Sequence, residues 1–488
     1  MSKIRVLGID LGTTALKAVL SDGHRVIGSA SAPVATRRPK PLWSEQAPAD
    51  WWSALQAACA DLSARHKADW RHVAAIGLSG HMHGAVLLKN GKPLRPCILH
   101  NDGRAAGEAA ALNDRLPGHA AIAGVRAMAG FTAPKLLWLR SHAPALLAEA
   151  DILLCPKDYL RFRLTGRHAT DPVDASGMWL LDVAKRQWCP DIVAATGLHM
   201  RQLPEIRDGN TLAGTLTPAA ARALRLPSGV AVATGTGDAA ANTLGLGLVN
   251  EGDGVISLGT AAQIFVSKTR HVPAPVQNIH AFAHALPGLW FQMAAMLNGA
   301  SPLAWAAALF APHERIPALL KQVEKGLAEP SRLLFLPYLT GERTPNDDPA
   351  MRAAFMGLDA STGKADMLRA TLEGIALSLA DAYDVLTRTG TVPHILYAVG
   401  GGFRSALWAR MIASALGREI SVIPASETGG ALGVARLARQ ALTGESNESV
   451  YGKPRKSSVI APDPVLQARF ETALPRYRAL YQALRPIR

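Results

Sequence analysis

Short apolar runs alternate with amphipathic stretches along this chain, in the order expected for strands and helices. Residues 4–31 predict a meander of three strands, in which Asp22-Gly23 marks a hairpin turn. An amphipathic helix is predicted from Pro48, followed by a strand over residues 73–78. The apolar stripe of that helix contains Trp52, Leu55, Cys59 and Leu62. Such an alternation is typical of an α/β fold.

The second half of the chain repeats this order of elements. A strand–turn–strand starts at Gly254, and a long amphipathic helix follows over about residues 365–388. A strand over 395–399 then ends in three glycines, before a helix near Arg404. One face of the long helix contains Leu368, Leu372, Ile375, Leu379, Ala382 and Leu386. The two halves therefore predict one architecture used twice.

The boundary between the halves is predicted from turn-forming residues. Residues 250–254 are rich in Gly, Asn and Asp, which favour a turn over a helix or strand. We therefore predict domains over residues 1–248 and 249–488. No low-complexity tract or long linker separates them, so they should pack closely around a shared cleft.

Composition and charge narrow the function classes. Hydrophobic residues make up 49% and charged residues 18% of the 488 residues, which is typical of a compact enzyme. The 52 basic and 38 acidic residues give a net charge of +14, which favours anionic partners such as nucleotides. The basic residues are scattered, with the densest clusters at 37–40 and 453–456. Nucleic acid is therefore not an expected partner.

The sequence also bears on the compartment. No apolar run reaches the roughly 18 residues of a membrane-spanning helix, and the first residues run directly into a strand rather than a secretory signal. The cysteines are too widely spaced for a metal knuckle or a redox pair, and are expected as small buried hydrophobes. They are Cys59, Cys97, Cys155 and Cys189. We predict a cytoplasmic protein with no membrane partner.

The first candidate site is the glycine-containing turn within residues 8–17. Gly12 allows a tight hairpin, and Thr13 and Thr14 offer hydroxyls and backbone N–H groups to an anion. Asp10 lies at the same turn, where its carboxylate would repel phosphates unless a cation lay between them. The combination predicts a site for a magnesium–nucleotide complex. The plain alternative is an Asx turn in which Asp10 binds its own backbone.

Two further segments of the second half favour nucleotide binding. Gly259-Thr260 repeats the glycine–threonine hairpin, and two such hairpins facing each other are the layout of actin-like ATPases. Gly401, Gly402 and Ser405 lie where a strand meets a helix, so the backbone could approach a flat ligand closely. An ordinary strand-to-helix turn is the alternative there.

Asp238 is the candidate catalytic base. It follows the apolar segment 230–233 and opens a helix near Ala239, whose N-terminal dipole would stabilise the ionised carboxylate. The carboxylate would orient a hydroxyl nucleophile and accept its proton late in phosphoryl transfer. An N-cap aspartate without a catalytic role is the alternative.

A Rossmann-type dehydrogenase is a distant alternative. Gly235-x-Gly237-x-x-Ala240 formally matches the dinucleotide fingerprint, with Glu251 further along the chain. Asp238 falls inside the phosphate turn, however, where it would repel a pyrophosphate. The motif also does not open a βαβ unit, so this reading is disfavoured.

The ordered set of motifs resembles the FGGY carbohydrate kinases, and among them most closely the xylulokinases. The similar segments cover nearly the whole chain: residues 8–17, 42–46, 82–84, 101–104, 131–138, 156–159, 335–345 and 427–433. The resemblance implies two RNase H-like (actin-like ATPase) α/β domains with a central catalytic cleft. It also implies a sugar kinase that requires ATP and Mg²⁺ and closes its domains on the sugar.

The resemblance further implies roles for individual residues. Asp238 falls on the catalytic base, and Asp10 on the residue that holds the metal with ATP. Met82 and His83 fall on the sugar-binding pair, and the neighbouring polar residues His81, Asp102 and Asn242 are expected at the same site. The implied nucleotide-binding residues are Asp10, Gly12, Thr13, Thr14, Lys17, Gly259, Thr260, Gly401, Gly402 and Ser405.

Two other questions stay open on the sequence. A mechanical actin-like protein, such as a filament former or chaperone ATPase, would keep the hairpins but lack the polar turns at 81–84 and 101–104. Glu342-Arg343 could form a local salt bridge or a domain-closure contact. Assembly as a homodimer is a further possibility.

The sequence departs from the xylulokinase pattern at three positions. That group usually has Gln, Trp and Asn where His81, His100 and Ala239 stand. Asn242 shares the face of Ala239 one helical turn further on, and could contact a longer substrate or act through a water. We therefore expect a linear pentulose kinase, D-xylulose first, with weak discrimination. Another ketose, a pentitol or gluconate is the alternative.

Overall fold

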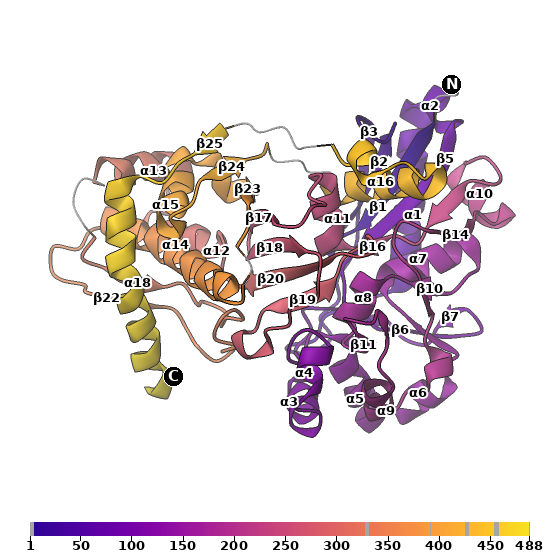
Figure 1. The fold of residues 1–488 in the computed structure, drawn as a ribbon, viewed down its shortest axis with the longest axis horizontal. Coiled ribbons are helices and arrows are strands. Elements are labelled where there is room, and N and C mark those ends of the chain that lie inside the picture. Colours follow the sequence, from indigo (N-terminus) through magenta and orange to yellow (C-terminus); the bar gives the residue numbers. More distant parts are fainter. Residues whose placement is uncertain (1–3, 327–330, 391, 425–428, 453–457, 488) are drawn as a thin grey trace.

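Two mixed sheets organise the molecule, one in each half of the chain (Figure 1). The computed structural model describes residues 4–326, 331–390, 392–424, 429–452 and 458–487. In these residues the first sheet has the order β14-β15-β5-β1-β2-β3, with β16 also paired to β5, and the second has the order β19-β20-β18-β17-β23-β24-β25. The first-sheet strands are β1 (Arg5–Leu11), β2 (Ala15–Ser21), β3 (Val26–Pro33), β5 (Val73–Gly80), β14 (Leu212–Thr215), β15 (Ala231–Ala233) and β16 (Thr236–Gly237). The second-sheet strands are β17 (Asp253–Leu258), β18 (Ala262–Lys268), β19 (His280–Ala283), β20 (Trp290–Met296), β23 (Ile395–Val399), β24 (Ile420–Val422) and β25 (Ser458–Ile460). The predicted α/β architecture with one sheet per half is confirmed.

The first sheet starts with the predicted meander. β1 pairs antiparallel with β2, and β2 with β3, while β5 joins β1 in parallel. The helix predicted from Pro48 is α1 (Pro48–Arg65), which packs on β2 and β3. Its buried stripe contains Trp51, not Trp52, so the prediction was wrong by one residue there. Trp52 is only half-buried and lies under the guanidinium of Arg163, 4.5 Å from its ring centroid.

The second sheet is covered by long helices. The predicted long helix is α14 (Lys364–Arg388), and all six apolar residues expected on its buried face are buried. β23 leads through a short 3-10 turn at Gly401–Arg404 into α15 (Ala406–Leu416), so this helix begins two residues later than predicted. The C-terminal helix α18 (Pro464–Leu484) packs against α14 and α15.

One helix of the second half of the chain lies on the first sheet. α16 (Gly429–Thr443) packs against β1, β5 and α11 (Asp238–Gly245), as its position beside β1 and β2 in Figure 1 also shows. Only glycine permits this approach: a Cβ on Gly8 would lie 1.8 Å from the Ala431 carbonyl oxygen, and one on Gly77 1.9 Å from that of Val434. A cut after residue 248 stays a prediction, but in space α16 belongs to the sheet of the first half.

A buried ion network joins α7 (Pro156–Thr165) to α8 (Pro172–Gly177). The Lys157 ammonium lies 2.5 Å from Asp158, 2.8 Å from Asp171 and 3.1 Å from Asp174, and all four side chains are buried. Asp171 also accepts a hydrogen bond of 3.0 Å from the hydroxyl of Thr236 on β16. The network therefore supports the strand that leads into Asp238. The four cysteines are free and buried.

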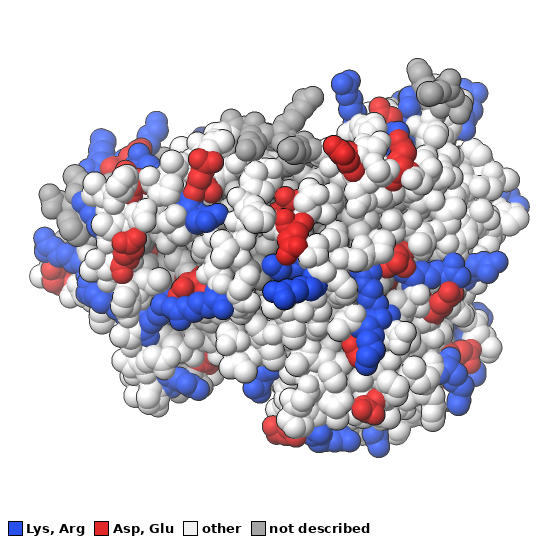
Figure 2. All heavy atoms as spheres, in the orientation of Figure 1, with Lys and Arg blue, Asp and Glu red and all other residues white. Residues whose placement is uncertain are grey.

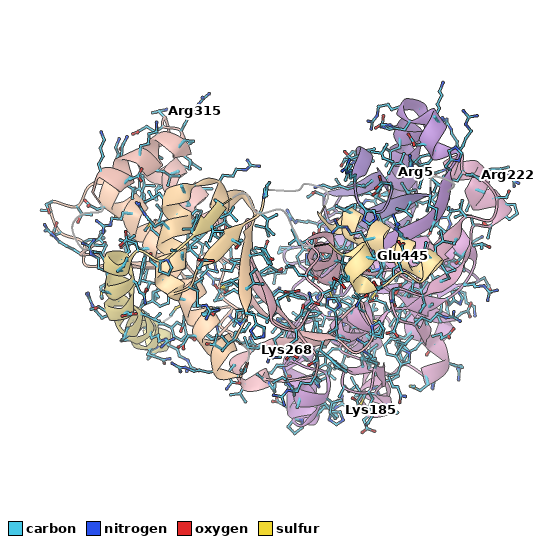
Figure 3. All side chains as sticks on the ribbon, turned by 45° about the horizontal axis from the view of Figure 1, so that its top comes forward. Arg5, Lys185, Arg222, Lys268, Arg315 and Glu445 are labelled. Carbon is cyan, nitrogen blue, oxygen red and sulfur yellow. The ribbon has the colours of Figure 1, made fainter. Side chains whose placement is uncertain are left out.

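Charged side chains are dispersed over the outside of the molecule. Figure 2 shows basic and acidic side chains interspersed on the face that it draws. Arg222 on α10 (Pro218–Leu224) and Arg315 just before α13 (Ile316–Lys325) project from opposite ends (Figure 3). The basic cluster at 453–456 lies outside the described residues. Within the described residues, every helix is too short or too polar to cross a bilayer.

Candidate active site

Three parallel strands bring the predicted catalytic and metal-binding residues to one edge of the first sheet. In the register of β1 and β5, Asp10 lies opposite Ser79, and in that of β16 and β5, Gly237 lies opposite Gly80. Asp238 follows directly as the first residue of α11. The Ser79 hydroxyl donates a 2.6 Å hydrogen bond to Asp10 Oδ1. The structure therefore brings Asp10 and Asp238 to the same end of the sheet, at the ends of the two strands that flank β5.

The electrostatics of Asp238 differ from the expectation. Its Oδ1 accepts a 2.8 Å hydrogen bond from the Ala239 amide at the start of α11. Burial, and then the nearby negative charge of Asp10, nevertheless raise the pKa of Asp238 to about 7. The amides at the start of the helix do favour the ionised form, as expected, but burial and Asp10 outweigh them. A carboxyl with a pKa near neutrality is suited to accept a proton.

Asp10 lies between the first hairpin and the start of α16. Burial raises the pKa of its carboxyl, despite the Ser79 hydrogen bond and the charge of Lys17. A Cβ on Gly430 would lie 2.8 Å from Asp10 Oδ2, so the backbone of α16 closes over this carboxylate. Asp10 and Asp238 are thus two neighbouring carboxyl groups with raised pKa values. Their oxygens form a donor set suited to a hard divalent cation.

The predicted phosphate hairpins occupy equivalent places in the two halves. Gly12, Thr13 and Thr14 form the turn between β1 and β2, where the Thr13 carbonyl accepts a 2.6 Å hydrogen bond from Gln46. Lys17 on β2 lies opposite Asp10. Gly259 and Thr260 form the turn between β17 and β18. Their carbonyls accept hydrogen bonds of 2.7 and 2.9 Å from the amides of Ala300 and Gly299.

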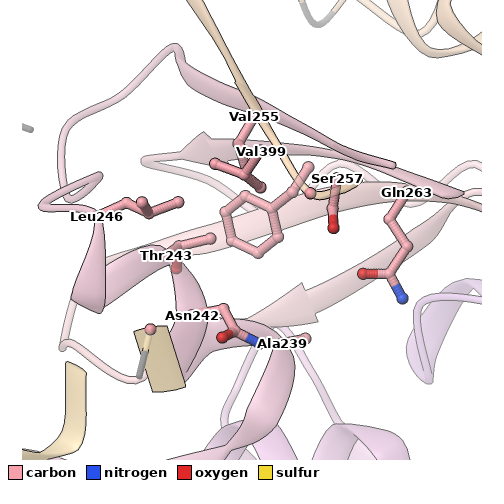
Figure 4. Close-up of a pocket in the computed structure, with 11 residues that line it drawn as sticks. Ala239, Asn242, Thr243, Leu246, Val255, Ser257, Gln263 and Val399 are labelled. Carbon is pink, nitrogen blue, oxygen red and sulfur yellow. The ribbon is translucent and has the colours of Figure 1, made fainter. Parts of the chain in front are cut away.

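A pocket of about 230 Å³ lies between α11 and the second hairpin (Figure 4). Ala239 and Asn242 face it from α11, and Ser257 and Gln263 face it from β17 and β18. Gly429, at the start of α16, also lines it. The Asn242 amide donates a 2.9 Å hydrogen bond to the Asp238 carbonyl. Asn242 therefore lies on α11 one turn beyond Asp238 and, as predicted, lines the same pocket as Ala239.

A second pocket, of about 580 Å³, holds the three residues expected near adenosine. Gly401, Gly402 and Ser405 line it together with α12 (Ser301–Phe310) and α13. Its walls are largely apolar, including Leu303 and Leu320. The Ser405 hydroxyl also accepts a 3.2 Å hydrogen bond from the Trp408 amide, so this residue is the N-cap of α15. Glu427 and Thr428 of the motif at 427–433 lie outside the described residues.

The predicted sugar residues follow β5. Met82 packs on Gly237, where a Cβ would meet its side chain at 2.7 Å, so this segment adjoins the residue before the base. His81 is buried, and among the described residues neither of its ring nitrogens has a hydrogen-bond partner. Burial, and then the electrostatic interactions with His100 and Lys135, lower the pKa of His81 to about 3. A neutral imidazole with free nitrogens suits a polyhydroxylated ligand.

Asp102 has a different environment from the one expected of a sugar ligand. Its two oxygens accept four hydrogen bonds, from the Ser44 amide at 2.6 Å and from the backbone, Nε and a terminal nitrogen of Arg104 at 2.7–3.0 Å. Arg104 in turn pairs with Glu45 at 2.7 Å and lies over the Trp43 ring. This saturation supports a role in shaping the turn and not direct contact with a sugar.

Of the two readings of Glu342-Arg343, the structure speaks against the local salt bridge, and the domain-closure contact stays a prediction. Glu342 is buried, and its carboxylate accepts hydrogen bonds of 2.8 Å from the amides of Leu297 and Arg343. Burial raises its pKa to about 7. In the described residues the Glu342 carboxylate thus binds backbone amides, and it forms no ion pair with the Arg343 guanidinium.

Sequence reasoning missed three residues beside the sugar segment. The Phe131 ring lies 4.7 Å from that of His83 and 5.9 Å from that of His280 on β19, which comes from the second half. Lys135, on α5 (Thr132–His142), is fully buried beneath them. Phe131 and Lys135 belong to a motif that the sequence singled out without a role. His280 had no sequence signal, because only the packing of the two halves brings it here.

The glycines of the formal dinucleotide fingerprint are used for packing. A Cβ on Gly235 would lie 2.2 Å from the Leu78 carbonyl oxygen, and Gly237 contacts Met82. These close approaches are to the protein itself, which removes the reason to expect a pyrophosphate there.

Comparison with known proteins covers both halves. Residues 5–245 match the model of the FGGY family of carbohydrate kinases, N-terminal domain, and residues 254–442 match its C-terminal domain. The chain is 39% identical to a xylulose kinase of Escherichia coli over 99% of both chains. It superposes on the crystal structure of a "xyloylose kinase" from Brucella ovis with a TM-score of 0.95, at 39% identity and over 99% and 100% of the two chains. It also superposes on a gluconate kinase from Lactobacillus acidophilus with a TM-score of 0.92, at 26% identity over 99% and 98%.

Proposed function

Because the chain belongs to the FGGY family of carbohydrate kinases, we propose that it phosphorylates D-xylulose with ATP, giving D-xylulose 5-phosphate. Full-length similarity to xylulose kinases supports the substrate. The observation that supports the chemistry is the position of Asp238, at a strand end beside Asp10 and next to the segment that contains Met82 and His83.

The residues of the chain suit a direct transfer to a sugar hydroxyl. Asp238 would accept a hydrogen bond from the reacting hydroxyl and orient its oxygen, then take the proton late, since the transition state is loose. The pKa near 7 matches this role. Burial of the site would limit competing transfer to water.

The residues also fit a magnesium–nucleotide complex. Bound Mg-ATP supplies the phosphoryl group and the cationic charge that neutralises its oxygens. Asp10 would hold the cation, and the two hairpins with Lys17 would hold the phosphates. The pocket lined by Gly401, Gly402 and Ser405 would take the adenosine, because its apolar walls suit a flat base.

The weaker alternative is a kinase acting on another ketose, a pentitol or gluconate. Ala239 removes a polar group beside the base, and Asn242 places one a turn further on, in the wall of the 230 Å³ pocket. The structural similarity to a gluconate kinase supports sugar acids as alternative substrates. A cytoplasmic location and a homodimer stay predictions.

A substrate panel tests the proposed function. We expect ADP release with D-xylulose, and with other pentuloses within about a thousandfold in kcat/KM. Losing a contact to a substrate hydroxyl costs little when it leaves no polar group of the protein without a hydrogen-bond partner. The measurement is a coupled ADP-release assay over pentuloses, pentitols, hexuloses, gluconate and glycerol. Turnover of no pentulose would contradict the function. A preference for D-xylulose beyond that range would contradict the weak discrimination.

The pH dependence should follow Asp238. A group whose pKa is raised to about 7 is protonated below that pH, and a protonated carboxyl cannot accept the proton of the sugar. We therefore expect kcat/KM for the sugar to fall about tenfold for each pH unit below about 6.5 and to level off above neutrality. A steady-state pH profile, with the coupling enzymes shown not to limit the rate, checks this. A flat profile between about pH 5.5 and 8 would contradict it.

A further inference from the structure

His83 stands in an unusual backbone conformation. Its φ of 69° lies in the left-handed region, which is costly for a residue with a side chain. Two side chains from the first turn of α5 stabilise it: Lys135 Nζ donates a 2.8 Å hydrogen bond to the His83 carbonyl, and the Thr132 hydroxyl donates one of 3.0 Å. The conformation of His83 is therefore fixed from outside its own segment.

The orientation of the His83 ring is fixed as well. Nδ1 lies 2.6 Å from the Gly177 carbonyl oxygen at the end of α8, and the imidazole ring packs against the ring of Phe131. A carbonyl oxygen can only accept, so Nδ1 must be the protonated nitrogen. Gly177 permits the contact, because a Cβ there would lie 2.8 Å from Nδ1. Burial holds the pKa of His83 well below its usual value, so the ring is neutral and Nε2 has a free lone pair.

Lys135 connects the segment of His83 to two other segments by hydrogen bonds. Its side chain is fully buried, which lowers its pKa to about 7, and its Nζ lies within hydrogen-bond distance of three carbonyl oxygens, those of His83 at 2.8 Å, Gly130 at 2.7 Å and Ile98 at 3.3 Å. In the part of the chain that the structure describes, these carbonyls and no carboxylate are its direct partners. The three carbonyls come from three separate segments around the sugar site, so one side chain sets the position of all of them.

We propose that the Gly177 carbonyl holds His83 as the Nδ1–H tautomer and that Lys135 and Thr132, through the His83 carbonyl, hold its ring in position, so that Nε2 accepts a hydrogen bond from a sugar hydroxyl. This rests on the proposed function. It makes His83 selective for a donor group: a hydroxyl is accepted there, and a carbonyl, ether or carboxylate oxygen is rejected. Lys135 and Thr132 are positioning residues in this scheme.

The tautomer can be measured without turnover. In protein labelled with ¹⁵N-histidine, the signals of His83 are those missing from His83→Gln. We expect Nδ1 to be protonated and Nε2 unprotonated at neutral pH. A protonated Nε2 would overturn the inference, whatever the enzyme phosphorylates.

The role of Lys135 is tested by a double-mutant cycle. Lys135→Met should raise KM for D-xylulose by about tenfold, the loss expected when a neutral hydrogen bond is misplaced, and leave KM for ATP within about twofold. In the His83→Gln background the same change should add little. Arg140→Met, exposed on the same helix, is the matched control and should change neither constant. An equal effect in both backgrounds would mean that Lys135 acts on the fold and not through His83.

Two further arms keep the test decisive. If Lys135→Met does not fold, Thr132→Val removes one of the two hydrogen bonds to the His83 carbonyl without changing the side-chain shape, and takes its place in the cycle. Analogues of D-xylulose with one hydroxyl replaced by a methyl ether should lose about tenfold in kcat/KM at one position, and this loss should vanish in His83→Leu. Equal tolerance at every position would overturn the inference. Failure to turn over D-xylulose itself would instead overturn the proposed function.

Discussion

Asp238→Asn should lower kcat by about 10²–10⁴-fold, the usual contribution of a positioned general base. The amide is nearly isosteric, so the hydrogen bond from the Ala239 amide can be kept while the proton acceptor is lost. The variant also removes one of the two neighbouring negative charges at the strand ends. We therefore expect ATP affinity to be unchanged or slightly improved, because less negative charge faces the phosphates.

The measurement combines the ADP-release rate at saturating sugar with nucleotide affinity from calorimetry. Asp191→Asn is the matched control, since its side chain is 77% exposed. It should leave both quantities unchanged. Retention of kcat within about threefold by Asp238→Asn would show that another group takes the proton.

Lys157→Met should destabilise the protein by ~3–5 kcal/mol, the typical effect of removing one partner from a buried ion network. The ammonium is the shared partner of Asp158, Asp171 and Asp174, none of which reaches solvent. Arg161, 2.9 Å from Asp158, cannot replace it for the other two. Because Asp171 also binds Thr236 on the strand before the base, we expect a loss of activity alongside the loss of stability.

Chemical unfolding followed by fluorescence checks this, with Lys185→Met as control. Lys185 pairs with Asp182 on the surface, where its side chain is 73% exposed, and the substitution should not shift the unfolding midpoint. If Lys157→Met yields no folded protein, Asp174→Asn still tests whether the lysine, and not each carboxylate, stabilises the network. Burial and the neighbouring carboxylates raise the pKa of Asp174 well above its usual value, so the amide should be tolerated. An Asp174→Asn variant as unstable as Lys157→Met would contradict this account.

Local patterns predicted much of the fold and the two glycine–threonine hairpins. The meander, α1, α14 and the two glycine–threonine turns depend on side chains close in sequence, and the structure has each of them. The shift from Trp52 to Trp51 reflects the limit of such reasoning, since a stripe on a helix does not state which neighbour the sheet will cover.

Features that depend on distant segments escaped prediction. Burial, and then Asp10 more than two hundred positions away, raise the pKa of Asp238, and no helix rule anticipates either effect. Asp102 has a side chain that could bind a sugar hydroxyl, but its oxygens already accept hydrogen bonds from Ser44 and Arg104. Lys135 was visible only as part of a motif, because its three carbonyl partners are brought together by tertiary packing.

The position of α16 has a consequence for how the polypeptide can be divided. The chain passes from the first half to the second after α11, returns before α16, and leaves again between α16 and β25. A fragment ending at residue 248 would therefore lack the helix that covers Gly8 and Gly77, leaving a bare face of sheet exposed to water. The second half is, in topological terms, not an appended module: it consists of the segment between α11 and α16 together with β25 and α18, which follow α16. Rearrangement of such a protein by recombination would have to keep the return segment together with the N-terminal piece, or lose both.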